Sequence, residues 1–237
     1  MKYQIAERFK SLQGEGVFAG TPMAFIRFVG CSVGKKICQH CDTTFERVLP
    51  WQGGGEYTPE ELADWSRPYE HICLTGGEPM DQNLEPLIAA MRPPDGHGPG
   101  PMIHVETSGT KPFDFPEGSF WICVSPKPGF REDMVAAADE VKVIVPGLGE
   151  LNSKVEEAKL AELPSEEGVR IIKAGGLRWP DVHDAIRWAK AGKTVFLQPR
   201  NGRVEIDKVN LMIVMDLLKD HPQLRLSTQL HKILKVQ

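Results

Sequence analysis

The feature that most constrains the fold is the alternation of short apolar runs with helix-like segments along all 237 residues. The apolar runs are nearly continuous in Val, Ile, Phe and Leu, which is typical of parallel strands covered by helices. We predict strands at residues 3–9, 23–29, 72–75, 102–106, 120–125, 141–145, 169–173, 194–198 and 223–228. Strands that alternate with helices predict an α/β fold built from βαβ units.

Helical patterns occupy the intervals between these strands. The clearest is Thr58-Pro59-Glu60-Glu61, which combines a threonine cap, a proline at the first helical position and a glutamate three residues after the cap. This helix is expected to run to about Trp65. Further helices are predicted at residues 83–91, 131–138, 152–163, 180–191 and 204–219.

Charge and composition exclude several classes of protein. The chain has 28 Lys and Arg against 32 Asp and Glu, a net charge of −4 that argues against nucleic acid as the main partner. It has no apolar run of about 18 residues and no signal-peptide pattern, so we expect a cytoplasmic protein with no membrane partner. No repeat or shift in composition divides it, which favours one domain. Glycine and proline gather at residues 53–55 and 93–101, which we expect to be mobile surface loops.

Polar or glycine-rich loops follow most of the predicted strands. Because the carboxyl ends of parallel strands meet at one edge of a sheet, these loops are expected to lie together. One such loop alone would be an ordinary turn, but the set predicts a ligand pocket at this edge. The loops are residues 11–16, 31–41, 75–79, 106–109, 125–127 and 198–201.

The five cysteines are unevenly placed. Cys31, Cys38 and Cys41 fall within eleven residues, whereas Cys73 and Cys123 each lie in an apolar run. We expect Cys73 and Cys123 to pack in the core as small apolar side chains. A set of disulfides is not expected, because the count is odd and the chain is neither small nor marked for secretion.

Three thiolates close in sequence can converge on one metal centre, and the residues alone leave two metals open. Structural zinc needs four ligands, and this loop offers a single Cys38-x2-Cys41 pair. The fourth zinc ligand would then come from one of the histidines, namely His40, His71, His104 or His231.

An iron–sulfur cluster is the second alternative. A [4Fe–4S] cluster usually takes four thiolates, so three would leave one iron open to a further ligand, such as the amino and carboxylate groups of S-adenosylmethionine. The turn Gly76-Gly77-Glu78 suits that ligand, because the glycines let the backbone come close and the glutamate can accept from an ammonium group.

The three-cysteine loop followed by GGEP resembles the radical S-adenosylmethionine superfamily. Within it, eight motifs in the same order resemble the 7-carboxy-7-deazaguanine synthases. These motifs are LQGEG (12–16), FIRFVGC (25–31), CDT (41–43), TGGEP (75–79), ET-x-G (106–109), SPK (125–127), QP (198–199) and SxQxHKxL (227–234). The resemblance implies a shortened, partial TIM-like (β/α) barrel that forms a single radical SAM core domain over residues 1–237.

The resemblance also implies roles for individual residues. The [4Fe–4S] cluster would be held by Cys31, Cys38 and Cys41. The S-adenosylmethionine contacts would be Gly77, Glu78, Ser125, Pro126, Lys127, Gln198, Pro199, Arg200 and Asn201. The pterin substrate would be bound by Leu12, Gln13, Gly14, Glu15, Arg27, Thr75 and the terminal Gln237. Thr43 would bind Mg²⁺, and the groups placed to move protons would be Glu106 and His231.

Four of these residues also have ordinary structural interpretations. Arg27 could be a surface charge on its strand, and Thr43 could cap the segment after the cysteine loop. Glu106 could be an ion-pair partner at a strand end, and His231 could be a polar residue with its hydrogen bonds satisfied.

The implied activity is the ring contraction of 6-carboxy-5,6,7,8-tetrahydropterin to 7-carboxy-7-deazaguanine with loss of ammonia. It belongs to deazapurine biosynthesis, for example of queuosine, and is started by a 5′-deoxyadenosyl radical. The resemblance further implies a homodimer and a flavodoxin- or ferredoxin-type electron donor. Two other functions stay open: another radical enzyme, such as a glycyl-radical activase, and a structural zinc module.

The sequence departs from the superfamily pattern in three places. The cysteine spacing is C-x6-C-x2-C, where C-x3-C-x2-C is common, which changes the length of the loop and leaves the ligand set intact. His40 stands where an aromatic carbocycle is usual. Residues 147–177 form a longer segment than expected, which fits an inserted βα unit or a dimer contact.

Overall fold

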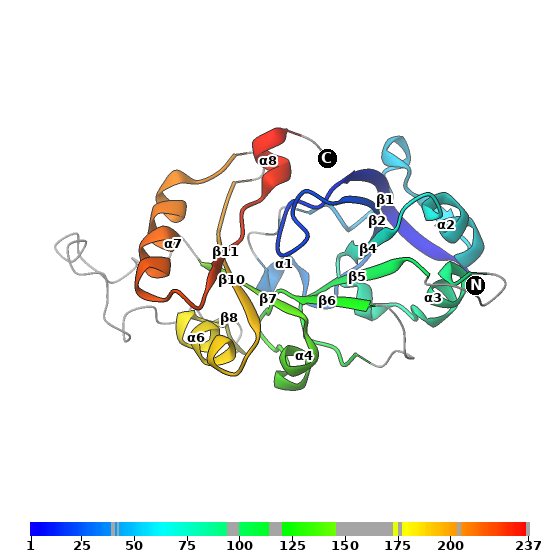
Figure 1. Ribbon diagram of the computed structural model, residues 1–237. Coiled ribbons are helices and arrows are strands. Elements are labelled where there is room, and N and C mark those ends of the chain that lie inside the picture. Colours follow the sequence, from blue (N-terminus) through cyan, green and yellow to red (C-terminus); the bar gives the residue numbers. More distant parts are fainter. Residues whose placement is uncertain are drawn as a thin grey trace.

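One mixed sheet organises the chain. The computed structural model describes residues 1–38, 41, 43–93, 100–113, 120–145, 173–174, 177–202 and 205–235. In this part, nine strands lie in the order β11-β10-β7-β6-β5-β4-β2-β1-β3 (Figure 1). Their bounds are β1 (Tyr3–Leu12), β2 (Pro22–Phe28), β3 (Gly55–Tyr57), β4 (His71–Gly76), β5 (Met102–Thr107), β6 (Phe120–Val124), β7 (Glu140–Val145), β10 (Thr194–Pro199) and β11 (Arg225–Leu226). A separate small hairpin joins β8 (Lys173–Ala174) to β9 (Leu177–Arg178).

The parallel arrangement predicted from the apolar runs is confirmed from β2 to β11. It is wrong for β1, which pairs antiparallel with both β2 and β3. The reason is the short connection 13–21, because parallel neighbours need a crossover of a dozen or more residues. The predicted mobile loop at 53–55 is also wrong: Gly55 pairs with Ile5 in β3, and a Cβ on Gly54 would lie 2.3 Å from the Ala6 carbonyl oxygen.

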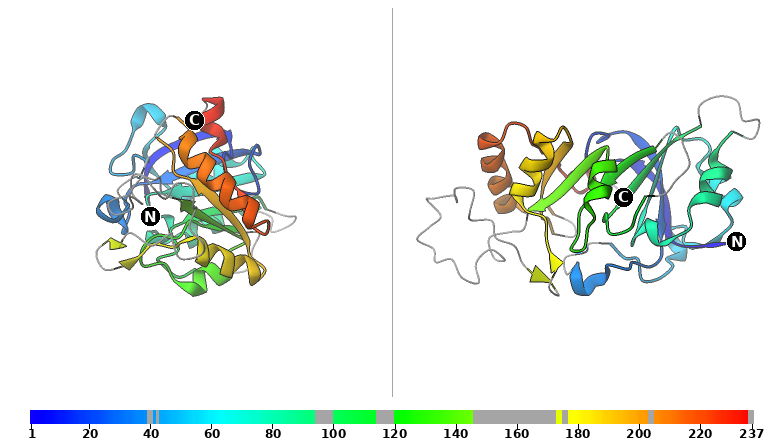
Figure 2. Two further views of the ribbon diagram at one scale, coloured as in Figure 1. Left: turned by 90° about the vertical axis from the view of Figure 1, so that its left-hand side faces the viewer. Right: turned by 90° about the horizontal axis from the view of Figure 1, so that it is seen from below.

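Helices flank the sheet. Figure 1 shows α2 and α3 near one end and α7 near the other, and the view from below in Figure 2 agrees. The predicted capping box of α2 is present, with the Glu61 N–H donating to Thr58 Oγ1 at 3.3 Å and the Thr58 N–H to Glu61 Oε2 at 2.8 Å. The helices are α1 (Gly34–Ile37), η1 (Pro50–Gln52), α2 (Pro59–Ser66), η2 (Pro79–Asp81), α3 (Glu85–Met91), α4 (Glu132–Ala137), α6 (Val182–Lys190), α7 (Lys208–Asp220) and α8 (Leu230–Leu234).

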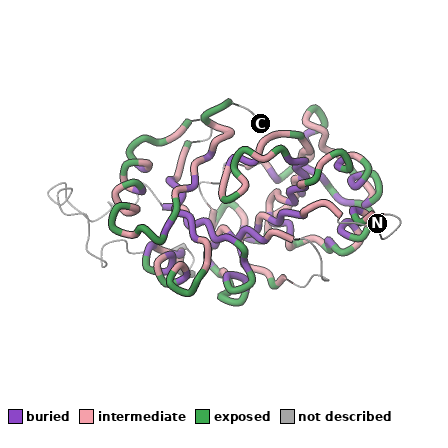
Figure 3. Tube along the Cα trace, viewed as in Figure 1, coloured by how far each residue is buried: buried purple, intermediate pink, exposed green. Residues whose placement is uncertain are grey.

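The helices bury one face of the sheet in two neighbouring apolar clusters. One contains Ile72 and Leu74 of β4 together with residues of α2 and α3, and the other contains Val141 of β7 with residues of α4, α6 and α7. Figure 3 shows the buried strands running between more exposed helices. Because side chains alternate along a strand, Cys73 and Thr75 of β4 face the opposite side, where the functional groups gather.

The sheet does not close into a barrel, and the loop 13–21 lies across its open side. The Val17 N–H donates to Glu140 Oε2 of β7 at 2.8 Å, and the Leu230 N–H of α8 donates to the Gly14 carbonyl oxygen at 2.8 Å. The predicted partial (β/α) barrel is therefore confirmed. Among the residues described, no helix has the length and apolar character needed to cross a membrane.

Some predicted elements cannot be compared with the structure. The predicted helix 152–163, most of the loop 93–101 and nearly all of the strand 169–173 lie outside the described residues. The same holds for the longer segment 147–177, apart from β8 and the first residue of β9.

Candidate active site

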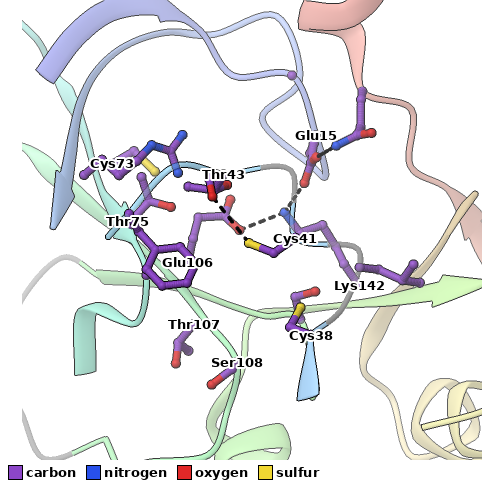
Figure 4. A pocket seen from close by; sticks show the side chains of 18 of the residues that line it. Glu15, Cys38, Cys41, Thr43, Cys73, Thr75, Glu106, Thr107, Ser108 and Lys142 are labelled. Atoms are coloured by element: carbon purple, nitrogen blue, oxygen red, sulfur yellow. Dashed lines mark hydrogen bonds and ion pairs between the residues drawn. The ribbon is translucent and has the colours of Figure 1, made fainter. Parts of the chain in front are cut away.

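A cavity of about 440 Å³ lies where the strands end (Figure 4). The structure brings together on its wall nearly all the site residues that the sequence predicts. They are Leu12, Gln13, Gly14, Glu15, Arg27, Cys31, Cys38, Cys41, Thr43, Thr75, Gly77, Glu106, Ser125, Lys127, Gln198, Pro199, Arg200, Asn201 and His231.

Among the described residues, two of the predicted site residues are not on this wall. Glu78 and Pro126 are buried and do not line the cavity. His40 and the terminal Gln237 lie outside the described residues. The structure thus offers a place for most of the implied contacts but not for a Glu78 carboxylate that reaches a ligand.

Glu78 instead accepts hydrogen bonds from neighbouring loops. Its Oε1 accepts from Thr107 Oγ1 at 2.6 Å and from the Met80 N–H at 3.0 Å. Its Oε2 accepts from the Ser108 N–H at 2.8 Å and also bonds to the Ser108 hydroxyl. With its side chain fully buried, Glu78 joins the TGGEP turn to the ET-x-G loop behind the cavity wall.

The glycine turn before Glu78 packs directly against the start of the cysteine loop. Gly76 has φ +136°, a conformation that residues with a side chain rarely adopt. A Cβ on Gly77 would lie 1.7 Å from the Gly30 carbonyl oxygen and 2.8 Å from Cys31 Cβ. Glycine is therefore required here for the close contact between the two loops.

The three neighbouring cysteines come from one loop and reach the same cavity. Cys31 follows β2 directly, Cys38 ends the short helix α1, and the Cys41 N–H donates to the Cys38 carbonyl oxygen at 3.1 Å. The Cys41 thiol lies 3.7 Å from the Thr43 carbonyl oxygen, which accepts from it. All five cysteines are free thiols, and Cys73 and Cys123 are buried as predicted, although Cys73 also borders the cavity.

Burial and one cation set the acidity of these thiols. Burial raises the pKa of Cys31. The hydrogen bond with Cys41 and then burial raise the pKa of Cys38 well above its usual range, while the Lys127 ammonium acts in the opposite direction. Burial lowers the pKa of Lys127, whose Nζ donates to the Ser125 carbonyl oxygen at 2.8 Å and to its Oγ at 2.7 Å.

Of the histidines considered as a fourth zinc ligand, His40 lies outside the described residues, and His71 and His104 do not line the cavity that holds the thiols. His71 Nδ1 and His104 Nε2 lie 2.8 Å apart, and both rings pack against Phe18. His231 borders the cavity and lies against Gly14. No group of three or more His, Cys, Asp or Glu within the described ranges is arranged to hold a bare metal ion.

A buried lysine that the sequence motifs did not indicate lies in the cavity wall. The Nζ of Lys142, on β7, is 2.6 Å from Glu15 Oε2 and 2.7 Å from Glu106 Oε2. Only 3% of the Lys142 side chain is exposed. The sequence feature that could have pointed to Lys142 is its position inside the apolar run 141–145, since a buried lysine requires charged partners.

Lys142 determines the charge state of the site. Burial alone would lower its pKa, but the surrounding anionic groups, including Glu106 and Glu15, raise it well above its usual value. Burial alone would likewise raise the pKa of Glu15, but the charge and hydrogen bond of Lys142, together with the Gln229 hydrogen bond and His231, outweigh burial and lower it to about 2. Burial raises the pKa of the neighbouring Glu140.

Amide side chains complete the surroundings of the two carboxylates. Glu15 Oε1 accepts from Gln229 Nε2 at 2.9 Å and from Gln198 Nε2 at 3.1 Å, and Glu106 Oε1 accepts from Gln13 Nε2 at 3.2 Å. Gln229 received no role from the sequence, although it stands inside the tail motif 227–234. Glu106 is thus an ion-pair partner and a wall residue at once.

Arg27 and Thr43 lie on the other side of the cavity. Arg27 Nε donates to Glu7 Oε1 at 2.6 Å, so the guanidinium has a carboxylate partner within the protein and is not a simple surface charge. Thr43 borders both the main cavity and a second one of about 260 Å³, which also contacts Glu7, Arg27 and His231. These four residues therefore form the boundary between the two cavities.

The partial barrel and the cavity with its three-cysteine loop place the chain in a class, the radical S-adenosylmethionine enzymes. No protein-family model matches the chain. Individual relatives do. The 7-carboxy-7-deazaguanine synthase of Bradyrhizobium diazoefficiens is 32% identical over 252 residues and covers all of both chains. The enzyme of the same name from Caulobacter vibrioides is 33% identical over 99% of both chains.

A solved structure agrees with these relatives. The crystal structure of QueE from Escherichia coli superposes with a TM-score of 0.64 at 26% sequence identity, over 98% of this chain and 95% of that one. The chain belongs to the 7-carboxy-7-deazaguanine synthase family.

Proposed function

We propose that this chain converts 6-carboxy-5,6,7,8-tetrahydropterin to 7-carboxy-7-deazaguanine with loss of ammonia, a carbon–nitrogen lyase reaction. The observation that carries the proposal is the pair of carboxylates, Glu15 and Glu106, beside the three-cysteine loop in one cavity. The product would serve deazapurine biosynthesis, for example of queuosine. Family membership supports the same activity and gives no support to a glycyl-radical activase or a zinc module.

The residues present fit a [4Fe–4S] cluster and S-adenosylmethionine. Cys31, Cys38 and Cys41 supply three sulfur donors, and Gly77 leaves no side chain between the turn and the loop. The polar wall for S-adenosylmethionine would be Ser125, Lys127 and residues 198–201. When bound, the cluster and S-adenosylmethionine supply the one-electron radical chemistry of the superfamily.

The chain's own residues would bind and orient the pterin. Glu15 and Glu106 present carboxylate oxygens, which suit the N–H groups along the edge of the pterin ring. Arg27 would bind the substrate carboxylate with its terminal nitrogens, while its Nε stays with Glu7. Leu12, Gln13, Gly14 and Thr75 would form the remaining contacts.

Metal and proton roles complete the proposal. Thr43, at the boundary of the two cavities, would bind Mg²⁺ together with oxygens of the substrate. Glu106 would hold or move a proton at its carboxylate, and His231 at its imidazole. Gln237 would reach the substrate from the end of the chain.

The assembly around the site is also a proposal. The chain would act as a single radical SAM core domain in a cytoplasmic homodimer and receive one electron from a flavodoxin- or ferredoxin-type donor. Its net charge of −4 suits a small-molecule substrate better than a nucleic acid.

The cofactor is tested by anaerobic reconstitution with iron and sulfide. We expect a brown protein with about four irons per chain, because three thiolates can hold a [4Fe–4S] cluster with one open iron. A Cys38→Ala variant should lose the cluster, whereas Cys73→Ala should keep it. A colourless protein with stoichiometric zinc would overturn the cluster and favour the zinc module.

The reaction is tested with the reconstituted enzyme. Incubation with carboxytetrahydropterin, S-adenosylmethionine, Mg²⁺ and a chemical reductant should yield 7-carboxy-7-deazaguanine, detected by mass spectrometry. An Arg27→Gln variant should raise KM for the pterin more than KM for S-adenosylmethionine. Absence of product from enzyme with its full iron content would defeat the proposed substrate.

A further inference from the structure

Lys142 connects two chain segments that would otherwise repel each other. Glu15 comes from the loop after β1, Glu106 from β5 and Lys142 from β7, and Figure 4 shows the ammonium between the two carboxylates. Since both carboxylate oxygens lie within 2.7 Å of one nitrogen, they are at most about 5.4 Å apart. Two partly buried carboxylates at this separation are not expected both to stay ionised without a cation, because each raises the pKa of the other.

The other charged groups near Lys142 do not replace it. Glu140, two residues earlier on the same strand, adds another acidic group and accepts from the Val17 N–H at 2.8 Å. The cavity wall holds other cations, namely Lys127, whose Nζ is held by two oxygens of Ser125, Arg27, whose Nε donates to Glu7, and Arg200. His231 also borders the cavity and acts to lower the pKa of Glu15. Among the described residues, however, Lys142 alone forms ion pairs with Glu15 and Glu106. The repulsion between the Glu15 and Glu106 carboxylates is therefore offset mainly by the Lys142 ammonium.

Hydrogen-bond counting shows what the pair offers to a ligand. Each carboxylate oxygen can accept about two hydrogen bonds. Among the described residues, Glu15 accepts three bonds and Glu106 accepts two, so acceptor positions remain on both. Both side chains are partly exposed, and both border the cavity. This side of the cavity therefore favours a ring edge that carries N–H donors.

We propose that Lys142 is a positioning residue for the reaction. It holds the carboxylates of Glu15 and Glu106 side by side as acceptors for the N–H groups of the pterin. The inference rests on the proposed function, since it assigns the ring edge of that substrate to these two side chains. The carboxylate pair also excludes substrates whose ring presents acceptor atoms on this edge, because each acceptor atom would face a carboxylate oxygen.

The test compares the pH dependence of KM for the pterin in three variants. In Lys142→Met the cation is lost and one carboxyl becomes protonated at pH 7, so KM should rise at least tenfold. KM should recover as the pH is raised towards 9, because the carboxyl then ionises. Lys142→Arg keeps a cation and should retain the wild-type pH profile even if its KM is higher.

A matched control separates this effect from general damage to the fold. Lys193 Nζ donates to the carbonyl oxygens of Ala136 and Ala138 and has no carboxylate partner among the described residues, so Lys193→Met should lower stability and leave the pH profile of KM unchanged. If KM of Lys142→Met rises by the same factor at every pH, Lys142 is merely structural and the proposal is wrong.

A second measurement needs neither substrate nor cofactor. Thermal unfolding of the cofactor-free protein at pH 7 should show Lys142→Met with a clearly lower Tm than wild type. The double variant Glu106→Gln/Lys142→Met should regain part of that loss, because only one carboxylate remains. If the Tm losses of Glu106→Gln and Lys142→Met simply add in the double variant, Lys142 does not act by offsetting the two carboxylates and the proposal is wrong. If wild type makes no product but the double variant regains stability, the proposed function fails while the carboxylate pairing stands.

Discussion

Replacing Glu78 by glutamine distinguishes a structural carboxylate from one that binds a ligand. The sequence suggested an acceptor for the ammonium group of S-adenosylmethionine, whereas the structure buries Glu78 completely beneath Thr107 and Ser108. Glutamine keeps the shape of the side chain but exchanges one acceptor oxygen for an NH₂ donor. The substitution therefore tests the hydrogen bonds without creating a cavity.

The expected cost follows from the four hydrogen bonds. The hydroxyls of Thr107 and Ser108 can reverse and accept, but the backbone N–H groups of Met80 and Ser108 cannot. Whichever way the amide is oriented, one of these N–H groups loses its acceptor, which costs about 1–3 kcal/mol. The remaining bonds also lose the assistance of the charge. We therefore expect Glu78→Gln to lose about 2–4 kcal/mol of folding free energy.

Thermal unfolding of the cofactor-free protein measures this loss. At roughly 2–4 °C per kcal/mol for a chain of this size, Tm should fall by about 5–15 °C. Glu85→Gln, an exposed change in the first turn of α3, should shift Tm by no more than about 2 °C. An unchanged Tm for Glu78→Gln, together with a large rise in the KM for S-adenosylmethionine, would refute the structural role and restore the ligand role.

Three further predictions follow from the cavity and its surroundings. Gly77→Ala should lower the iron content after reconstitution, because its Cβ would lie 1.7 Å from the Gly30 carbonyl oxygen and force the start of the cysteine loop away. Thr43→Ala should retain the cluster and require more Mg²⁺ for half-maximal activity, which a magnesium titration measures. Burial and then His71 lower the pKa of His104 to about 4. Because the unfolded chain takes up a proton below pH 6.5, wild type should lose stability between pH 6.5 and 4, and His104→Asn should show a flatter dependence of Tm on pH.

Most strands were predictable because each is a continuous apolar run long enough to be buried, as in 141–145 and 194–198. β3 was not, since its three residues contain Gly55 and Glu56 and gain their structure only by pairing with β1. The antiparallel β1 was missed for a similar reason. Its run looks like any buried strand, and its direction is set by the short connection 13–21.

The site residues likewise fall into two groups, those that the sequence predicts and those that it does not. Residues in recognisable motifs, such as Arg27 of β2 and Thr43 after the cysteine loop, were predicted from the sequence and lie on the cavity wall. Lys142 belongs to no motif, and its importance depends on carboxylates 127 and 36 residues away that only the folded chain brings near. The sequence predicted Glu78 as a ligand contact, whereas the structure buries its carboxylate against Thr107 and Ser108, because sequence does not show on which side of a turn a side chain lies.

The loop 13–21 lies across the open side of the sheet, and this has a consequence for how the protein is made. Glu15 bonds to Gln229, 214 residues further along the chain, and the Leu230 N–H bonds to the Gly14 carbonyl oxygen. During synthesis the first strands can pair long before residues 225–235 leave the ribosome, but this wall of the cavity cannot form until they do. Insertion of the cluster is therefore expected to follow translation, and a nascent chain stalled before residue 225 should not retain S-adenosylmethionine.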